Sequence, residues 1–153
     1  MMNTFYYASP LGVLKIIHEG QTIFALDFVK RKSRQTLSFK KQPEQKIAKQ
    51  LDEYFCSQRT TFQLELAPSG TSFQLRVFQK LCAIPFGKTV SYGQLAKAIG
   101  QPQAAQAVGQ AVRNNPIALI IPCHRVIGSN GKLIGFAGGL WRKKWLLKHE
   151  RVV

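Results

Sequence analysis

Residues 121–127 read Ile121-Pro122-Cys123-His124-Arg125-Val126-Ile127, and place a cysteine between a proline and a histidine inside an apolar stretch. A lone cysteine is usually a small buried hydrophobe, and we give Cys56 and Cys82 that interpretation. Cys123 differs because a polar pair follows it, and nearby cations favour the thiolate that acts as a nucleophile. We therefore predict that Cys123 is a reactive thiol.

A histidine base needs a partner that fixes its tautomer, and Glu150 is the only acidic residue after Glu65. An acid at a helix C-terminus is disfavoured by the helix dipole, so Glu150 is expected to have a specific role. We predict that Glu150 orients His124 and stabilises its imidazolium. Neighbouring side chains of an extended segment point apart, so contact between His124 and Cys123 is expected through a water or a bend at Pro122.

Outward from this run, the chain predicts extended structure on both sides of Cys123. Ile117 to Ile121 is expected to be a buried strand, after Asn114-Asn115-Pro116 ends a helix. Val126-Ile127 and Leu133-Ile134, joined by an Asn-Gly turn, predict a short hairpin. A flexible glycine-rich segment and a last amphipathic helix from Leu140 to His149 follow.

Upstream, the pattern is helical. Thr71 caps an expected helix that stops at Pro85, and Ser91-Tyr92-Gly93-Gln94 has the form of a capping box for a second, short helix. Gly100 ends that helix, and Pro102 is expected to open another that runs to Arg113. Two helices joined by a tight glycine-containing turn in an acid-poor region indicate a helix-turn-helix.

The second helix of this pair carries small residues almost throughout, at Ala104, Ala105, Ala107, Gly109 and Ala111. Such a helix can be a face for close helix packing. It can equally approach the narrow minor groove of DNA, where shape and backbone are recognised rather than base sequence. The residues alone leave both interpretations open.

The first part of the chain has a different pattern. Three β-type segments, Phe5 to Tyr7, Val13 to Ile17 and Ile23 to Val29, predict an antiparallel meander. A helix is expected from Pro43, and the basic segment Lys30 to Lys41 is interpreted as a solvated linker. Since Ala67-Pro68-Ser69-Gly70 punctuates the chain, we predict an α/β (α+β) protein with domains at 1–68 and 69–153.

Charge indicates the partner. The 153 residues contain 22 Lys+Arg and 7 Asp+Glu, a net charge of +15, and residues 70–153 hold 12 of the basic residues and one acid. This distribution predicts a nucleic-acid-binding surface in the C-terminal part. No apolar stretch approaches membrane-helix length and the start lacks a signal-peptide pattern. Three irregularly spaced cysteines favour neither disulfides nor zinc, so no metal or cofactor is expected.

Together, residues 121–127, Asn115-Pro116, residues 135–139 and Leu146-Leu147-Lys148-His149-Glu150 resemble the O6-alkylguanine-DNA alkyltransferase family. The resemblance covers residues 71–150 and extends to the N-terminal part through Ser9-Pro10-Leu11-Gly12. It implies a ribonuclease H-like N-terminal domain and a winged-helix-like C-terminal domain. It also implies irreversible transfer of the alkyl group from O6-alkylguanine, and also from O4-alkylthymine, to Cys123 after base flipping from the minor groove of duplex DNA.

The resemblance also implies residue roles. His124 would relay through water between Cys123 and Glu150, Asn115 would join that network, and Tyr92 would donate its phenol proton toward guanine N3. The implied base pocket contains Val126, Phe136, Ala137 and Gly138, and the implied DNA-binding residues are Ser91, Ala105, Gln106, Ala107, Gly109 and Arg113.

Two positions depart from the family pattern. Gln106 stands where an arginine usually fills the base stack, which predicts weaker flipping or DNA affinity. Phe136 stands where many relatives have tyrosine, which predicts a changed substrate preference.

Three alternatives remain beside alkyl transfer: a non-catalytic binder of alkylated lesions, a thiol hydrolase, and a transcriptional regulator. Cys123 argues against the lesion binder, the basic helix-turn-helix against the hydrolase, and the Cys123, His124 and Glu150 set against the regulator. We expect a monomer that binds double-stranded DNA and no membrane, in the cytoplasm, or in the nucleus of a eukaryote.

Overall fold

The structure is a computed structural model and describes residues 1–30, 42–136 and 138–152. The chain forms two compact units, Met1–Pro68 and Ser69–Val153. The predicted linker from Lys30 to Lys41 lies outside the described residues except for Lys30. In the part of the chain that the structure describes, no helix is long and apolar enough to cross a membrane.

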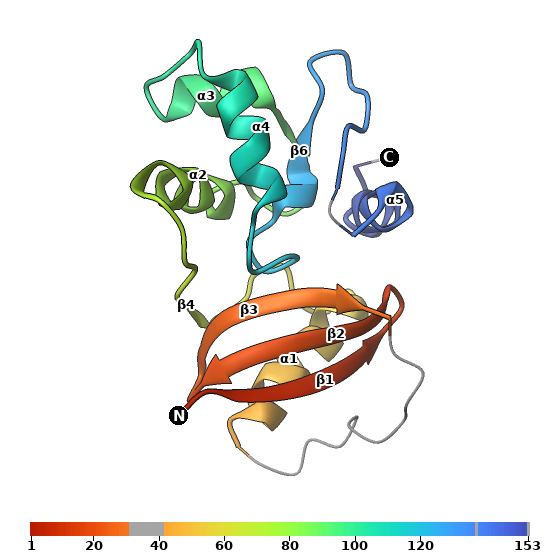
Figure 1. The fold of residues 1–153 in the computed structure, drawn as a ribbon. Helices are drawn as coiled ribbons and strands as arrows, with labels where there is room; N and C mark the ends of the chain where they lie inside the picture. Colours follow the sequence, from red (N-terminus) through yellow and green to blue (C-terminus); the bar gives the residue numbers. More distant parts are fainter. Residues whose placement is uncertain (31–41, 137, 153) are drawn as a thin grey trace. The chain divides into compact units, whose positions relative to one another are not determined.

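The first unit is a sheet covered by one helix (Figure 1). Strands β1 (Asn3–Ser9), β2 (Gly12–Glu19) and β3 (Thr22–Val29) form the antiparallel meander that the alternating pattern predicted. A two-residue strand, β4 (Glu65–Leu66), adds to β3 in parallel. Alternate side chains of β2 are buried because successive residues of a strand face opposite sides of the sheet.

Helix α1 (Glu44–Phe55) begins directly after Pro43 and supplies the other layer of this core. Ile47, Leu51 and Tyr54 recur at helical spacing and are fully buried. His18 is buried and pairs with Glu44, its Nε2 lying 3.0 Å from Oε2. The first unit is therefore an α/β layer pair, as predicted.

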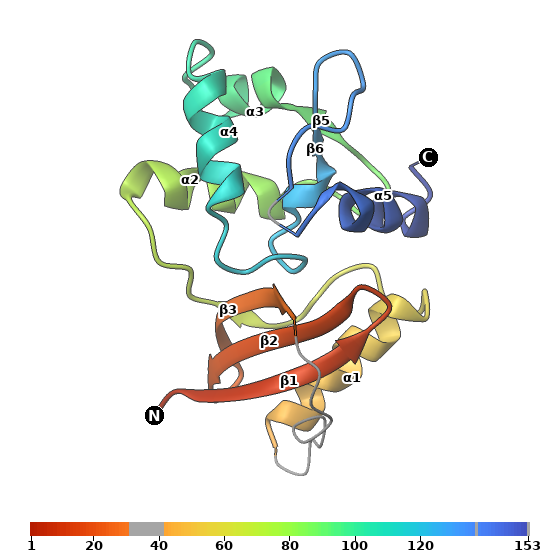
Figure 2. The same ribbon diagram turned by 45° about the vertical axis from the view of Figure 1, so that its right-hand side comes forward.

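The second unit begins with three helices, α2 (Ser72–Cys82), α3 (Tyr92–Ala98) and α4 (Ala105–Arg113), which contact one another (Figure 2). Both predicted caps are present. The Thr71 hydroxyl accepts from the Gln74 N–H at 3.1 Å, and Ser91 Oγ accepts from the Gln94 N–H at 3.0 Å. α4 begins at Ala105 rather than at Pro102, because Pro102 and Gln103 form a turn instead.

The predicted strand from Ile117 to Ile121 is wrong. These residues form a turn in which the Ile121 N–H donates to the Ile117 carbonyl at 3.0 Å. Leu119 has a φ of 73°, which is incompatible with a strand. The apolar run indicates that residues 119–123 are buried, which they are, and does not indicate an extended backbone.

The predicted hairpin is wrong as well. Strand β6 (Val126–Ile127) pairs in parallel with β5 (Val90–Ser91) and not with Leu133-Ile134. The Asn-Gly turn does form, and the Gly128 N–H donates to the Lys132 carbonyl at 2.8 Å. The pairing stops there because the next carbonyl in reach, that of Ile134, accepts hydrogen bonds from side chains of other elements.

The last helix, α5 (Leu140–His149), has the predicted bounds and follows Gly139, whose φ of 96° suits glycine. It contacts a single turn of 3₁₀ helix, η1 (Cys123–Arg125), and both views show the two elements side by side (Figures 1 and 2). This contact places the end of α5 beside the Cys123 segment.

Thr71→Ala is expected to lower the free energy of unfolding by about 1 kcal/mol, because the Gln74 N–H at the start of α2 loses the hydroxyl that accepts its hydrogen bond. Chemical denaturation measures this change. Thr71→Ser keeps the hydroxyl and is expected to retain most of the stability, so an equal loss in both variants would contradict the capping role.

Candidate active site

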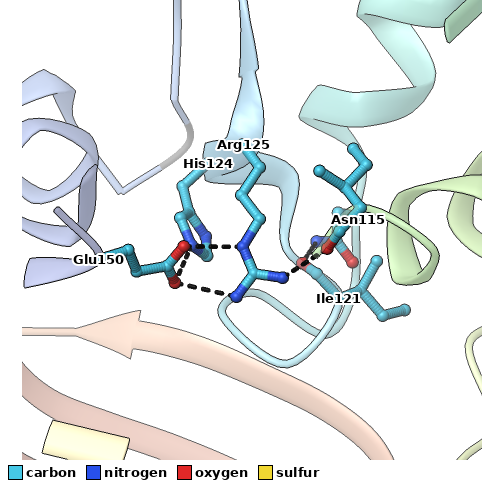
Figure 3. Close-up of polar contacts among 6 residues, drawn as sticks. Asn115, Ile121, His124, Arg125 and Glu150 are labelled. Carbon is cyan, nitrogen blue, oxygen red and sulfur yellow. Dashed lines mark hydrogen bonds and ion pairs between the residues drawn. The ribbon is translucent and has the colours of Figure 1, made fainter. Parts of the chain in front are cut away.

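Asn115 holds the loop that carries Cys123. Its Nδ2 donates to the Ile121 carbonyl at 2.8 Å, and its Oδ1 accepts from the Ile117 N–H at 3.0 Å (Figure 3). One amide side chain thus spans both ends of the turn between α4 and η1. The Cys123 N–H donates to the same Ile121 carbonyl at 2.8 Å, so the position of the cysteine follows from that of Asn115.

The Cys123 thiol is buried, with 6 % of the residue exposed. Burial raises its pKa, while a hydrogen bond with the Asn115 side chain and the positive charge of Lys143 oppose the rise. A neighbouring cation favours the thiolate, as predicted, but desolvation outweighs it, so the pKa of Cys123 is raised overall. Such a thiol needs a base to accept its proton.

His124 has the geometry of that base. Its Nε2 lies 2.8 Å from Oε2 of Glu150, and both side chains are fully buried. Burial lowers the pKa of His124 despite the carboxylate, which keeps the ring neutral at neutral pH. With Nε2–H donating to Glu150, Nδ1 carries the lone pair, and this buried atom has no hydrogen-bond partner among the described residues.

Arg125 is the functional neighbour that sequence reasoning missed. Its Nε donates to Oε1 of Glu150 at 2.8 Å and its Nη2 to Oε2 at 3.0 Å (Figure 3). Nη1 donates to the Ile84 carbonyl at 2.7 Å. The paired arginine compensates the buried carboxylate, which otherwise would be costly. The available signal was its place directly after His124 in the Cys123 run.

Lys143 is the second missed residue. It is fully buried in the middle of α5, seven positions before Glu150 and so on the same face of the helix. Its Nζ donates to the carbonyls of Ile134 and Gly135, at 2.9 and 3.3 Å. The sequence signal for Lys143 was its spacing of seven residues from Glu150, which places the two on one face of the helix; composition does not contain this information.

Tyr92, the first residue of α3, shares one of these acceptors. Its hydroxyl donates to the Ile134 carbonyl at 3.1 Å, and burial raises its pKa, so the phenol stays protonated. The ring packs near α4, since a Cβ on Gly109 would lie 3.7 Å from its Cδ1. A small residue at Gly109 therefore leaves the space that the Tyr92 ring occupies.

A cavity of about 330 Å³ opens between α3, α4 and the segment after β6. Its lining combines predicted DNA-binding residues with two that were not predicted, Gln110 and Ile134; the full lining is Tyr92, Ala105, Gln106, Gly109, Gln110, Arg113 and Ile134. Cys123 is not part of this lining and lies buried. The cavity is large enough for part of a nucleotide, and two of its lining residues, Tyr92 and Ile134, are joined by a hydrogen bond.

The remaining predicted residues divide into several groups. Val126 is buried in β6, Phe136 and Gly138 are half-buried, and Ala137 lies outside the described residues. Ala107 is exposed and does not line the cavity, and Ser91 caps α3. Of the small residues of α4, Ala111 is packed in the core, as the helix-packing interpretation expects. Ala105 and Gly109 instead face the cavity.

Two family models match this chain. Residues 72–152 match the 6-O-methylguanine DNA methyltransferase DNA-binding domain, and residues 2–68 match the ribonuclease-like domain of the same family. The chain belongs to this family. The predicted fold class, a sheet with one helix followed by a helical unit, is confirmed by these matches and by the structure.

Relatives extend over nearly the whole chain. The methylated-DNA--protein-cysteine methyltransferase of Methanosarcina barkeri is 46% identical over 93% of this chain and 92% of its own length. The protein of that name from Haemophilus influenzae is 41% identical, over 96% and 85%. The structure also resembles Mycobacterium tuberculosis OGT solved in complex with DNA, with a TM-score of 0.87 and 42% identity over 97% and 92% of the two chains.

Arg125→Met is expected to lower the free energy of unfolding by about 3–5 kcal/mol, because it leaves the buried Glu150 carboxylate without its charged partner. Urea denaturation measures the loss. Lys148→Met removes one positive charge from an exposed position of α5 and serves as the matched control. Equal stability of the two variants would show that the Arg125 and Glu150 pair is not what holds η1 against α5.

Proposed function

We propose that this protein repairs DNA by transferring the alkyl group of O6-alkylguanine, and also that of O4-alkylthymine, to Cys123. The observation that carries the proposal is the fully buried pair of His124 and Glu150, next in sequence to the buried Cys123, in a member of the 6-O-methylguanine DNA methyltransferase family. A neutral imidazole bound to a carboxylate beside a high-pKa thiol is suited to removing the proton of that thiol.

The transfer begins when His124 Nδ1 accepts the Cys123 proton, directly or through a water. The sulfur then attacks the alkyl carbon, a carbon–sulfur bond forms, and the bond from that carbon to guanine O6 breaks. The electron pair passes into the guanine ring, and Tyr92 delivers a proton toward N3. Glu150 stabilises the imidazolium, and Asn115 holds the loop on which the thiol lies.

One proton leaves the thiol and one reaches the base, so the step is balanced in charge. The product is a thioether, which is stable, and guanine leaves unmodified. Each molecule therefore acts once, as a single-turnover methylated-DNA--protein-cysteine methyltransferase.

The DNA-binding face in this proposal is α4 with its cavity. Gln106 and Arg113 are exposed there, with Ala105 and Gly109 on the same side. Small side chains allow close approach to the minor groove, and Arg113 supplies charge for a phosphate. We include Ser91 and Ala107 as backbone-contacting positions, and Val126, Phe136, Ala137 and Gly138 as the base pocket.

Tyr92 and Ile134 both line the cavity. A flipped base that accepts a hydrogen bond from the Tyr92 hydroxyl replaces the Ile134 carbonyl as its acceptor. Binding of the base thus exchanges one acceptor of the same phenol for another.

We further propose that residues 69–153 carry both DNA binding and alkyl transfer, that residues 1–68 form a separate α/β domain, and that the protein works as a monomer. The division agrees with the compact units and with the two family matches. A cytoplasmic location, or a nuclear one in a eukaryote, follows from the proposed DNA substrate. The net charge of +15 supports a polyanionic partner.

Incubation with a duplex carrying O6-methylguanine is expected to add one methyl group to Cys123 and to no other residue, as measured by intact mass and peptide mapping. Cys123→Ala is expected to remain unmodified while still binding the lesion. Wild-type protein that binds the lesion without any mass change would instead support the alternative, a non-catalytic lesion-binding protein.

Gln106→Arg is expected to speed methyl transfer from duplex DNA by about tenfold, because arginine adds stacking and charge in the opened base stack worth about 1.4 kcal/mol. The measurement is the single-turnover rate. Transfer from the free O6-methylguanine base is expected to be unchanged, since no stack has to be opened. Gln103→Arg adds the same charge outside the cavity and is the control; equal acceleration by both variants would assign the effect to net charge.

A further inference from the structure

The described part of residues 133–139, which follows strand β6, forms one wall of the proposed base site; we call it the pocket wall. Ile134 lines the cavity, and Phe136 belongs to the base pocket that we propose. Within the described part of this segment, the Gly139 N–H donates to the Phe136 carbonyl at 2.8 Å. Glycines with positive φ stand near both ends, with φ of 47° at Gly135 and 96° at Gly139. Because glycine leaves the backbone free to turn, contacts with other elements decide where the pocket wall lies.

The first turn of α5 supplies such contacts from two consecutive residues. The Arg142 guanidinium donates through Nη1 to the Gly138 carbonyl. The Lys143 side chain donates to the carbonyls of Ile134 and Gly135, at 2.9 and 3.3 Å. Consecutive side chains of a helix point about 100° apart, so one turn of helix reaches both ends of the pocket wall. Hydrogen bonds from charged donors are stronger than neutral ones, which suits an anchor.

Trp141 provides a surface on which the Arg142 guanidinium lies. The guanidinium carbon is 4.5 Å from the centroid of the indole ring, within the range of a cation–π contact. The same ring lies against the backbone of Gly139, since a Cβ there would be 3.4 Å from Cδ1 of Trp141. Trp141 is 54 % exposed and so contributes little to the core. Its ring instead connects Arg142 with the end of the pocket wall.

The pocket wall also contacts α3 and α4, which line the cavity. The Tyr92 hydroxyl donates to the Ile134 carbonyl at 3.1 Å, and a Cβ on Gly135 would lie 3.4 Å from Nε of Arg113. A base that takes the Tyr92 hydroxyl removes the first of these contacts. The hydrogen bonds from α5 do not involve Tyr92, so they hold the pocket wall while the base binds.

We propose that Arg142 is a positioning residue of the alkyl-transfer site: its guanidinium, seated on Trp141, fixes the Gly138 end of the pocket wall against which the alkylated base is held. This role rests on the proposed function, whereas the contact with Gly138 is a property of the free protein. Arg142 acts on the base through the pocket wall, so no bond to Arg142 forms or breaks. Lys143 holds the Ile134 end separately, so loss of Arg142 is expected to loosen the wall at one end.

The first experiment measures amide hydrogen exchange of Gly139 by NMR in the free protein. In Arg142→Met, exchange is expected to rise about tenfold, because the Gly138 carbonyl loses its charged donor and the adjacent turn opens more often. The Gly128 amide, which donates across the Asn-Gly turn, is expected to exchange as before. Lys144→Met removes the same charge from an exposed position of α5 and is the matched control.

The second experiment separates positioning from DNA binding. At saturating duplex carrying O6-methylguanine, the single-turnover rate of Arg142→Met is expected to fall about tenfold, while its affinity for the duplex matches that of Lys144→Met. Transfer from the free O6-methylguanine base is expected to fall equally, because the pocket wall holds the base however it arrives. Arg142→Lys keeps a cation and a donor and is expected to restore part of the rate and part of the Gly139 protection.

Unchanged Gly139 exchange in folded Arg142→Met, or an equal rise in Lys144→Met, would overturn the proposal. Faster exchange with an unchanged transfer rate would also overturn it, because the contact would then not position the base. Near-ultraviolet circular dichroism shows whether each variant is folded. If Arg142→Met does not fold, Trp141→Leu removes the ring beneath the guanidinium and is expected to raise Gly139 exchange about threefold; no rise would refute the role of Arg142.

The exchange measurement needs neither DNA nor alkyl transfer. If exchange rises in Arg142→Met but the wild-type protein transfers no methyl group from O6-methylguanine, the proposed function fails while the contact stands. If the wild type transfers the methyl group and Arg142→Met transfers it at the same rate, the role of Arg142 fails while the function stands.

Discussion

The buried Glu150 carboxylate is the contact on which the site depends. It receives one hydrogen bond from His124 and two from Arg125, at 2.8 to 3.0 Å (Figure 3). His124 and Arg125 both belong to η1, and Glu150 directly follows α5. The Glu150 carboxylate therefore joins the cysteine segment to the last helix. Its full burial makes each partner obligatory, since an unpaired carboxylate there would be costly.

The thiol is controlled by opposing effects. Burial raises the pKa of Cys123 and protects it from unwanted reaction, whereas Asn115 and Lys143 act in the opposite direction. Because burial outweighs the other two effects, the thiol stays protonated in the resting protein at neutral pH.

Local patterns were sufficient for much of the fold and some of the site. The strands of the meander, the capping boxes at Thr71 and Ser91, and the bounds of α5 follow from alternation, capping chemistry and helical spacing. The pairing of His124 with Glu150 was predictable, because residues 70–153 contain a single acid. The turn at Ile117 to Ile121 was not predictable. An apolar run indicates burial only, and the turn depends on the hydrogen bond of Asn115 and on the positive φ of Leu119.

By itself the sequence determined the family, the meander of the first unit and the capped helices of the second, because propensity, capping and motif are local properties. Tertiary structure decided the ionisation of the site. Whether Cys123 is a thiol or a thiolate, and whether Lys143 and Arg125 are solvated or buried, depends on how α5 packs against η1. The physical reason is that desolvation and ion pairing arise from groups far apart in the chain, and composition does not record their distances.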